Sequence, residues 1–232
     1  MNKAKIVFYC KNCGNEHAKW HGQCKYCKEW NSLKEKKVSS LKIKSQTEFG
    51  NYSKKENIPL KISEIDSEDE IRLIVKDDEW NRVLGGGLVL GSVCLISGEP
   101  GIGKSTLLLQ TSMKFNKKVL YVSGEESQRQ IKVRSERIGK AIGQTFILSE
   151  TELETIFEQI NGINPEIVII DSIQTLHSKM IDGSPGSVTQ IRDCSSELIK
   201  YAKSTGSAVI LIGHLTKDGS IAGPKVLEHM VD

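Results

Sequence analysis

A short glycine-rich stretch of this chain carries the residue types and spacing of a phosphate-binding loop. Residues 98–105 read Gly-Glu-Pro-Gly-Ile-Gly-Lys-Ser and match G-x-x-x-x-G-K-[ST] at every fixed position. The glycines let backbone N–H groups turn toward phosphate oxygens, and a helix that starts here adds a favourable dipole. The Lys104 amine can reach the β- and γ-phosphates, while the Ser105 hydroxyl can bind Mg²⁺. The stretch therefore predicts nucleotide binding.

Carboxylates at the ends of two apolar runs supply what hydrolysis needs beyond binding. Asp171 ends one run, where it can hold Mg²⁺ through water beside Ser105, although a strand-end aspartate can also cap the next turn. Glu125 and Glu126 follow the first apolar run after the loop, and a carboxylate there can orient and deprotonate the attacking water. We favour Glu125 over Glu126. His214 follows the last apolar run and is either a sensor of the γ-phosphate or a structural histidine.

A second group of reactive side chains lies near the start of the chain. Cys10, Cys13, Cys24 and Cys27 form two C-x-x-C pairs separated by ten residues. Four thiolates presented by two tight turns suit a closed tetrahedral zinc site. A segment this short cannot bury a sufficient core, so Zn²⁺ binding would supply its folding energy. Disulfides are the alternative, but nothing else here indicates secretion, and cytosolic thiols are kept reduced.

Five further ring-bearing side chains lie inside the cysteine-rich module. His17 and His21 could replace a thiolate, but four cysteines are already present, so we expect both histidines at the surface or beside the ligands. Trp20, Tyr26 and Trp30 either pack as the apolar interior of the module or form a platform on which bases stack. We favour packing, because a zinc knuckle has few other apolar groups.

Short apolar runs alternate with amphipathic stretches from about residue 64 onward. Runs with the length and Val/Ile/Leu content of buried strands lie at 92–97, 118–123, 145–148, 166–170 and 207–213. Helices are expected at 104–115, 151–162 and 187–203. Thr151 and Glu154 have the spacing of a capping box at the start of the second helix. Strands that alternate with helices predict an α/β fold, with a mostly parallel sheet flanked by helices.

Length and composition limit the class of protein. The chain has 232 residues, of which 38% are hydrophobic, which allows one good-sized domain and a small module and excludes wholesale disorder. No apolar run approaches the ~18–20 residues that span a bilayer, and residues 1–8 lack the apolar stretch of a signal peptide. We therefore expect a cytoplasmic protein without a membrane partner.

The net charge of +3 divides unevenly along the chain. Residues 1–61 hold 14 Lys/Arg against 5 Asp/Glu, whereas the remaining residues hold 18 against 24. A basic arm joined to an acidic body suits an end that faces a polyanion. A solvated Lys-rich linker is the alternative reading of the same charges.

Several motifs, in order along the chain, resemble one known family. They are the four-cysteine knuckle and the segments 81–87, 98–106, 121–127, 213–217 and 219–232. Together they are similar to the bacterial RadA/Sms family of RecA-related DNA repair and recombination proteins. The resemblance covers nearly the whole chain except the linker. It implies a C4 zinc finger at 1–33, a basic linker at 34–63 and a RecA-like P-loop ATPase core at 64–232.

The family pattern also implies an ATP hydrolase and assigns roles to residues of this sequence. Lys104 and Glu125 carry catalysis, with Glu125 in the place of the RecA-like catalytic glutamate. Mg²⁺ is assigned to Ser105 and Asp171, and zinc to the four cysteines of the knuckle. ATP is held by Gly98, Glu99, Pro100, Gly101, Ile102, Gly103, Lys104, Ser105, Thr106, Asp171 and His214.

The same resemblance implies a role on DNA. Its family binds single-stranded DNA and branched recombination intermediates, forms ring-shaped homo-oligomers, and drives helicase or branch-migration activity with ATP; a recombinase is a candidate partner. Segments 172–187 and 215–223 correspond to RecA-type DNA-facing loops, which suit the approach of a phosphate backbone. Lys179 and Lys217 are either DNA contacts within them or solvated charges.

The chain departs from the family pattern in two ways. The family continues past Asp232 with a Lys-Asn-Arg-Phe-Gly motif and a Lon-protease-like domain, so we expect a truncated chain. Its ATP turnover alone should be weak or absent, because RecA-type sites use a basic residue of a neighbouring subunit. Residues 75–80 replace a stretch that usually contains Thr-Gly-Ile, and Leu90 stands where proline is common.

Two other functions remain open on the sequence alone. One is a regulatory RecA-like ATPase without motor activity. The zinc knuckle joined to the P-loop domain argues against it, because regulatory ATPases of this kind lack such a knuckle. The other is a zinc-dependent DNA or protein interaction module with an inactive ATPase remnant. ATP-dependent affinity for single-stranded DNA separates the motor from this last alternative.

Overall fold

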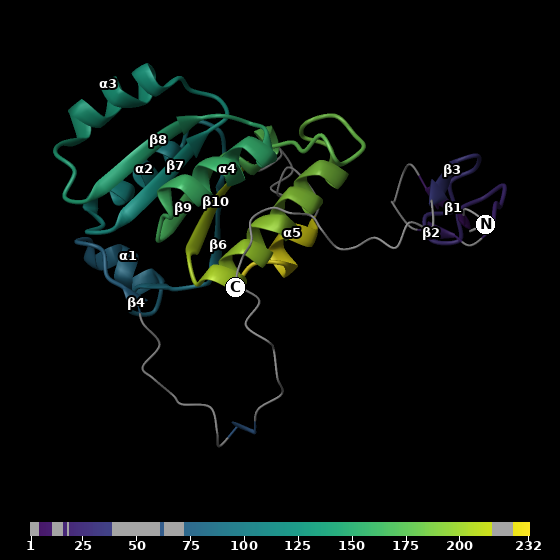
Figure 1. The fold of residues 1–232 in the computed structure, drawn as a ribbon, viewed down its shortest axis with the longest axis horizontal. Coiled ribbons are helices and arrows are strands. Elements are labelled where there is room, and N and C mark those ends of the chain that lie inside the picture. Colours follow the sequence, from purple (N-terminus) through teal and green to yellow (C-terminus); the bar gives the residue numbers. More distant parts are fainter. Residues whose placement is uncertain (1–4, 11–15, 18, 39–60, 63–71, 215–224) are drawn as a thin grey trace. The chain divides into compact units, whose positions relative to one another are not determined.

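The computed structural model describes residues 5–10, 16–17, 19–38, 61–62, 72–214 and 225–232. The chain divides into two compact units, Met1–Glu48 and Phe49–Asp232 (Figure 1). Each unit is described by itself below.

The larger unit is built around a five-stranded parallel sheet. Its strands are β6 (Val93–Gly98), β7 (Lys118–Ser123), β8 (Gln144–Ser149), β9 (Ile167–Asp171) and β10 (Ala208–His214). They lie in the order β6-β10-β9-β7-β8, and all pairs are parallel. All five predicted strands are confirmed, each within one residue at either end. Because the strands are parallel, their carboxyl ends share one edge of the sheet.

Helices cover both faces of this sheet, as Figure 1 shows. They are α2 (Lys104–Lys114), α3 (Gln128–Ile138), α4 (Leu153–Ile163) and α5 (Val188–Thr205). One apolar cluster joins α4 and α5 to the sheet, and a second joins α2 and α3 to it. Neighbouring residues of β9 belong to different clusters, Val168 to the first and Ile169 to the second, as the two-residue repeat of a strand requires. The prediction of an α/β fold is confirmed.

Smaller elements complete the larger unit. They are β4 (Arg72–Leu73), α1 (Asp78–Val83), β5 (Leu88–Val89) and two 3₁₀ turns, η2 (Ile173–Thr175) and η3 (Lys225–His229). Helices α1 and α3 were not predicted from the sequence. Among the helices of the described ranges, none combines the length and the apolar character that crossing a bilayer requires.

The predicted capping box at the start of α4 is wrong. The helix begins two residues later than expected, and its N-cap is Glu152, whose side chain makes no capping bond. Thr151 instead pairs with an extended segment that contains His177, since its carbonyl oxygen accepts a hydrogen bond from His177 N at 2.9 Å. The Glu154 carboxylate accepts a hydrogen bond from the Ser178 hydroxyl rather than from the helix start. The predicted apolar face of α4 is nevertheless fully buried.

The smaller unit is a three-stranded antiparallel sheet with a loop of cysteines. Strand β1 (Lys5–Cys10) lies between β2 (Glu16–His17) and β3 (Leu33–Val38). Strand β3 pairs with β1 along its whole length, from Leu33 to Val38. The sheet therefore runs five residues into the stretch predicted as a linker at 34–63. A run of lysines hid this strand, because its charge pattern is also that of a solvated linker.

Candidate functional site

The glycine-rich loop joins β6 to α2 at the carboxyl edge of the sheet. Gly101 and Gly103 have φ of +79° and +104°, a region that other residues rarely adopt. Gly103 is the N-cap residue of α2 and has no side chain with which to cap it. The N–H groups of the first helical turn are thereby left to other acceptors, as phosphate binding requires.

The Lys104 side chain is folded back into this loop. Its Nζ donates hydrogen bonds to the carbonyl oxygens of Gly98 and Glu99, at 2.8 and 2.9 Å. The residue is buried at the start of α2, with 8% of its surface exposed. Its ammonium group is thus held against the loop backbone, and the phosphate oxygens of a nucleotide can replace the two carbonyl oxygens as its acceptors.

Tyr121 connects the two residues predicted to hold Mg²⁺. Its hydroxyl donates to Asp171 Oδ2 at 2.6 Å and lies 3.3 Å from the carbonyl oxygen of Ser105. Burial, followed by the nearby Asp171 carboxylate, raises the pKa of Tyr121 well above its usual range. The hydroxyl therefore remains a donor at physiological pH. The sequence analysis missed this residue because a tyrosine within an apolar strand has the pattern of ordinary core packing.

Glu125 lies where the ends of three strands meet. Its Oε1 is 3.3 Å from His214 Nε2, at the end of β10, and accepts a hydrogen bond from Ser172 Oγ at 3.3 Å, directly after β9. The Glu125 side chain is 54% exposed, so water reaches its carboxylate. His214 is in register with Gly98, the first residue of the loop. The structure thus brings Glu125 and His214 together beside the glycine-rich loop.

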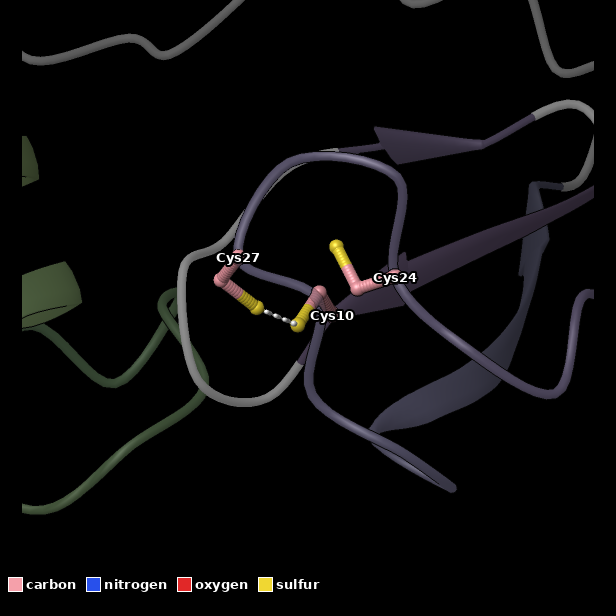
Figure 2. Close-up of side chains that lie close together, drawn as sticks. All are labelled: Cys10, Cys24 and Cys27. Carbon is pink, nitrogen blue, oxygen red and sulfur yellow. Dashed lines mark hydrogen bonds between the residues drawn. The ribbon is translucent and has the colours of Figure 1, made fainter.

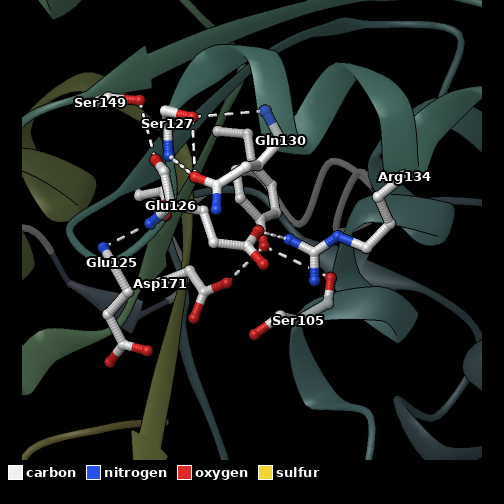
Figure 3. A network of polar contacts seen from close by, with 10 residues as sticks. Ser105, Glu125, Glu126, Ser127, Gln130, Arg134, Ser149 and Asp171 are labelled. Carbon is white, nitrogen blue, oxygen red and sulfur yellow. Dashed lines mark hydrogen bonds and ion pairs between the residues drawn. The ribbon is translucent and has the colours of Figure 1, made fainter.

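Glu126 has a different environment from Glu125. Its carboxylate forms an ion pair with Arg134 of α3, and its backbone carbonyl accepts a hydrogen bond from Ser149 Oγ at 2.9 Å. The two neighbouring carboxylates point in different directions in Figure 3. Arg134 is a second residue that the sequence analysis missed, since an arginine in an amphipathic helix normally faces solvent.

Gly124 allows the chain to turn between β7 and Glu125. A Cβ atom at this position would lie 2.0 Å from Thr175 Oγ1 and 2.5 Å from Thr175 Cβ. Both distances are far below van der Waals contact, so any other residue would displace η2. The Gly124 N–H also donates to the carbonyl oxygen of Asp171 at 2.8 Å. The close approach fixes the distance between the ends of β7 and β9.

Three cysteine sulfurs converge in the smaller unit. The Sγ atoms of Cys10, Cys24 and Cys27 all lie within 4.8 Å of one another (Figure 2). His17 is buried beside them, with Nε2 at 3.4 Å from Cys24 Sγ, and Cys10 Sγ donates to Ser32 Oγ at 3.2 Å. Three clustered thiols suit a tetrahedral zinc site that takes one further ligand. Cys13, the predicted fourth ligand, lies outside the described residues.

Two families match the chain over these two regions. The AAA domain family matches residues 59–220, and the rubredoxin metal binding domain family matches residues 8–35. The first match covers more than half of the chain and includes the glycine-rich loop, Glu125, Asp171 and His214. The chain belongs to the AAA domain family. The second match contains the cysteine cluster, so the smaller unit is a metal-binding ribbon.

Curated relatives agree with this assignment. The chain is 46% identical to the DNA repair protein RadA of Halalkalibacterium halodurans over 235 aligned residues, which cover 100% of this chain and 51% of the relative. It is 45% identical to RadA of Bacillus subtilis, with 100% of this chain and 51% of the relative aligned. It is also 45% identical to RadA of Campylobacter jejuni, with 100% of this chain and 52% of the relative aligned. The predicted resemblance to the RadA/Sms family is confirmed. The chain spans about half the length of the curated relatives it matches.

Of the two lysines predicted to contact DNA, the structure describes Lys179. Lys179 lies between η2 and α5, and its Nζ forms an ion pair with Glu152 Oε2 at 2.7 Å. A hydrogen bond and the charge of Glu152 raise the pKa of Lys179. Its side chain is 71% exposed. Lys217 lies outside the described residues.

The prediction that three aromatic side chains pack inside the metal-binding ribbon is wrong. Trp20, Tyr26 and Trp30 are 55%, 69% and 68% exposed. The described interior of the ribbon contains Cys10, Cys24 and Leu33. The interior is formed around the sulfurs instead, and the three rings lie at the surface.

Proposed function

We propose that this chain is the ATP-binding and ATP-hydrolysing part of a DNA repair motor. The observation that carries the proposal is the arrangement at the carboxyl edge of the sheet. There the glycine-rich loop, Asp171 and Glu125 come from three separate strands and meet beside His214. A phosphate cradle, a buried carboxylate and an exposed carboxylate are the three groups that phosphoryl transfer to water requires.

Each group has a distinct part in the proposed reaction. The loop N–H groups and the Lys104 amine hold the phosphates of ATP, and Ser105 with Asp171 would hold Mg²⁺, which neutralises charge that develops on the phosphates. Glu125 orients the attacking water and accepts its proton. Glu126 is less suited to this role, because Arg134 already occupies its carboxylate. His214 contacts Glu125 and is in register with the loop, which suits a sensor of the γ-phosphate.

The cysteine cluster supports a structural zinc site. Cys10, Cys24 and Cys27 would hold Zn²⁺ together with Cys13, and His17 contacts one of the sulfurs from the side. In this role Zn²⁺ organises the ribbon and performs no chemistry on the nucleotide.

Relatives named as DNA repair proteins support a role on DNA. We propose that the substrates are single-stranded DNA and branched recombination intermediates. The full-length protein would act as a ring-shaped homo-oligomer with a recombinase as partner. ATP would drive branch migration or strand separation. Segments 172–187 and 215–223, with Lys179 and Lys217, are proposed to face the strand. Turnover by this chain alone should be weak, because a neighbouring subunit supplies a basic residue in related sites.

Paired substitutions at the site test this proposal in the full-length protein. Lys104→Ala should abolish ATP binding, whereas Glu125→Gln should keep ATP affinity and lower DNA-stimulated hydrolysis about 100-fold, as loss of a general base does. The matched control is Glu158→Gln, which changes an exposed carboxylate of α4 and should leave both quantities unchanged. Normal turnover in Glu125→Gln would refute the catalytic assignment. ATP-dependent DNA affinity without strand movement would instead indicate a regulatory ATPase.

A further inference from the structure

The metal-binding ribbon exposes most of the surface of three large aromatic side chains. Trp20, Tyr26 and Trp30 each keep more than half of their surface in contact with solvent. Large apolar side chains that are exposed together on a small domain are typical of a surface that binds a partner. All three lie within 11 residues of one another, in the loop that also carries Cys24 and Cys27.

The two indole rings are held close to one point of the backbone. A Cβ atom at Gly22 would lie 3.6 Å from Trp30 Cζ3 and 4.0 Å from Trp20 Cη2. The backbone fixes this arrangement, because Asn31 N donates to the carbonyl oxygen of Gly22 at 2.8 Å and Gln23 pairs with Trp30 in an antiparallel bridge. The indole rings of Trp20 and Trp30 therefore both lie next to Gly22, which has no side chain to separate them.

Tyr26 is linked to the cysteine cluster. Its ring centre lies 5.9 Å from that of His17 in an edge-to-face arrangement, and His17 Nε2 contacts Cys24 Sγ at 3.4 Å. The Lys28 N–H donates to the carbonyl oxygen of Cys24 at 2.9 Å, which closes the turn that presents Tyr26. The positions of the aromatic rings thus depend on the same turns that present the sulfurs.

The segment that carries these rings is also rich in exposed positive charge. Lys19, Lys25, Lys28 and Lys34 are exposed on the ribbon, and Glu29 is the one acidic residue of the segment 19–34. Flat hydrophobic rings among lysines match the chemistry of single-stranded nucleic acid, whose bases can stack while its phosphates contact ammonium groups. Bases of a duplex are already stacked on one another and cannot do so.

We propose that Trp20, Trp30 and Tyr26 form a platform on which bases of single-stranded DNA stack, with the exposed lysines of the same segment on its phosphates. This inference deepens the proposed function and rests on it for the identity of the strand. The platform would give the chain a strand contact in the ribbon that is independent of the segments proposed to face DNA in the AAA domain. The zinc site would act on DNA affinity indirectly, by holding the rings in place.

Intrinsic fluorescence offers a direct measurement of stacking. The chain has three tryptophans, two of which belong to the platform, while Trp80 is 9% exposed in the AAA domain. Titration of the zinc-loaded chain with single-stranded oligothymidylate of about 16 nucleotides should quench the fluorescence of Trp20 and Trp30. The quenching should saturate together with fluorescence anisotropy of a labelled oligonucleotide. A duplex of the same length should produce little quenching.

Substitutions then separate stacking from general folding. Trp20→Ala and Trp30→Ala should each weaken binding about tenfold, whereas Trp20→Phe and Trp30→Phe should retain most of it, since phenylalanine also stacks. The matched control is Phe146→Leu, which removes a 38% exposed ring from the AAA domain and should change nothing. Zinc content, measured on each variant, shows that the ribbon is intact.

Different failures have different meanings. Wild-type affinity in both alanine variants would refute the platform, while the proposed binding of single-stranded DNA would stand on other residues. Equal losses in the Phe and Ala variants with zinc retained would also refute it, because stacking tolerates the change of ring. No binding by the wild-type chain or the full-length protein would refute the proposed DNA function and the platform with it.

Discussion

The two units of this chain are held together by different forces. The AAA domain has two apolar clusters, one on each face of its sheet, with strand residues that are entirely buried. In the described part of the ribbon the buried apolar cluster contains two cysteines and one leucine, the polar residues His17 and Ser32 are also buried, and Trp20, Tyr26 and Trp30 are exposed. Burial of apolar surface stabilises the first unit, whereas the second is too small for that term to suffice. The comparison indicates that metal binding replaces a hydrophobic core in the ribbon.

Removal of zinc should have the largest effect, and it should act on the ribbon alone. A structural zinc site contributes about 10–16 kcal/mol in small metal-dependent domains, which exceeds what the three buried apolar side chains of the described ribbon can supply. A strong chelator, or the substitution Cys24→Ser, should therefore unfold the ribbon and leave the AAA domain folded. Amide hydrogen exchange should show that β1 and β3 lose their protection, while β7 and β9 keep theirs.

The matched control for this experiment is Cys94→Ser. Cys94 lies half-buried in β6 of the AAA domain, outside the cysteine cluster, so its substitution should leave the zinc content unchanged. Protection of β1 that persists after complete removal of the metal would contradict the comparison. It would show that the ribbon has an apolar or hydrogen-bonded core of its own.

A cavity in the AAA domain should produce the reverse pattern. Phe157 is 2% exposed on α4, and its ring packs edge-to-face on Tyr201 of α5, with 5.9 Å between ring centres. Phe157→Ala should lower the free energy of unfolding of the AAA domain by about 3–5 kcal/mol, because buried contacts are lost and a cavity remains. Denaturant unfolding measures this change, and the zinc affinity of the ribbon should stay the same. A loss below about 1 kcal/mol would show that the α4 face collapses around the gap.

The sequence predicted most of the AAA domain because its signals are local. Each strand is a continuous apolar run, and the glycine-rich loop has fixed spacing, so both could be located without long-range contacts. Ser127 and Gln130 also have capping-box spacing and form that box at the start of α3, yet the helix was not predicted. Its turns bury little apolar surface, and Ile131 is its one fully buried residue, so the periodic signal is weak.

Other features depend on contacts that no local pattern contains. Thr151 and Glu154 satisfy the rule for a capping box, but bonds to His177 and Ser178, more than 20 residues away, override it. The exposure of Trp20 and Trp30 depends on how the chain folds around the sulfurs, which their residue types do not reveal. Tyr121 joins Ser105 to Asp171 because β7 and β9 are neighbours in the sheet, which a tyrosine in one strand cannot reveal.

The smallest effect is expected from Tyr121, which connects the core of the AAA domain to Asp171 of the candidate site. Tyr121 is fully buried and donates to Asp171 Oδ2 at 2.6 Å, so Tyr121→Phe removes a bond that orients the carboxylate without changing the packing. Partners of this kind commonly change metal affinity by about 10-fold. The Mg²⁺ concentration for half-maximal binding of a fluorescent ATP analogue should therefore rise about 10-fold, while metal-free nucleotide affinity should be unchanged.

Tyr201→Phe is the control that separates positioning from stability. Tyr201 is also buried, and its hydroxyl bonds to Ser207 Oγ at 3.0 Å, on the α5 side of the sheet. Loss of either hydroxyl should cost about 1 kcal/mol of folding stability, since each removes one buried hydrogen bond. Only Tyr121→Phe should change the dependence on Mg²⁺. Equal shifts in the two variants would mean that Tyr121 acts through the stability of the core, and no shift in either would mean that Asp171 is held by the strand alone.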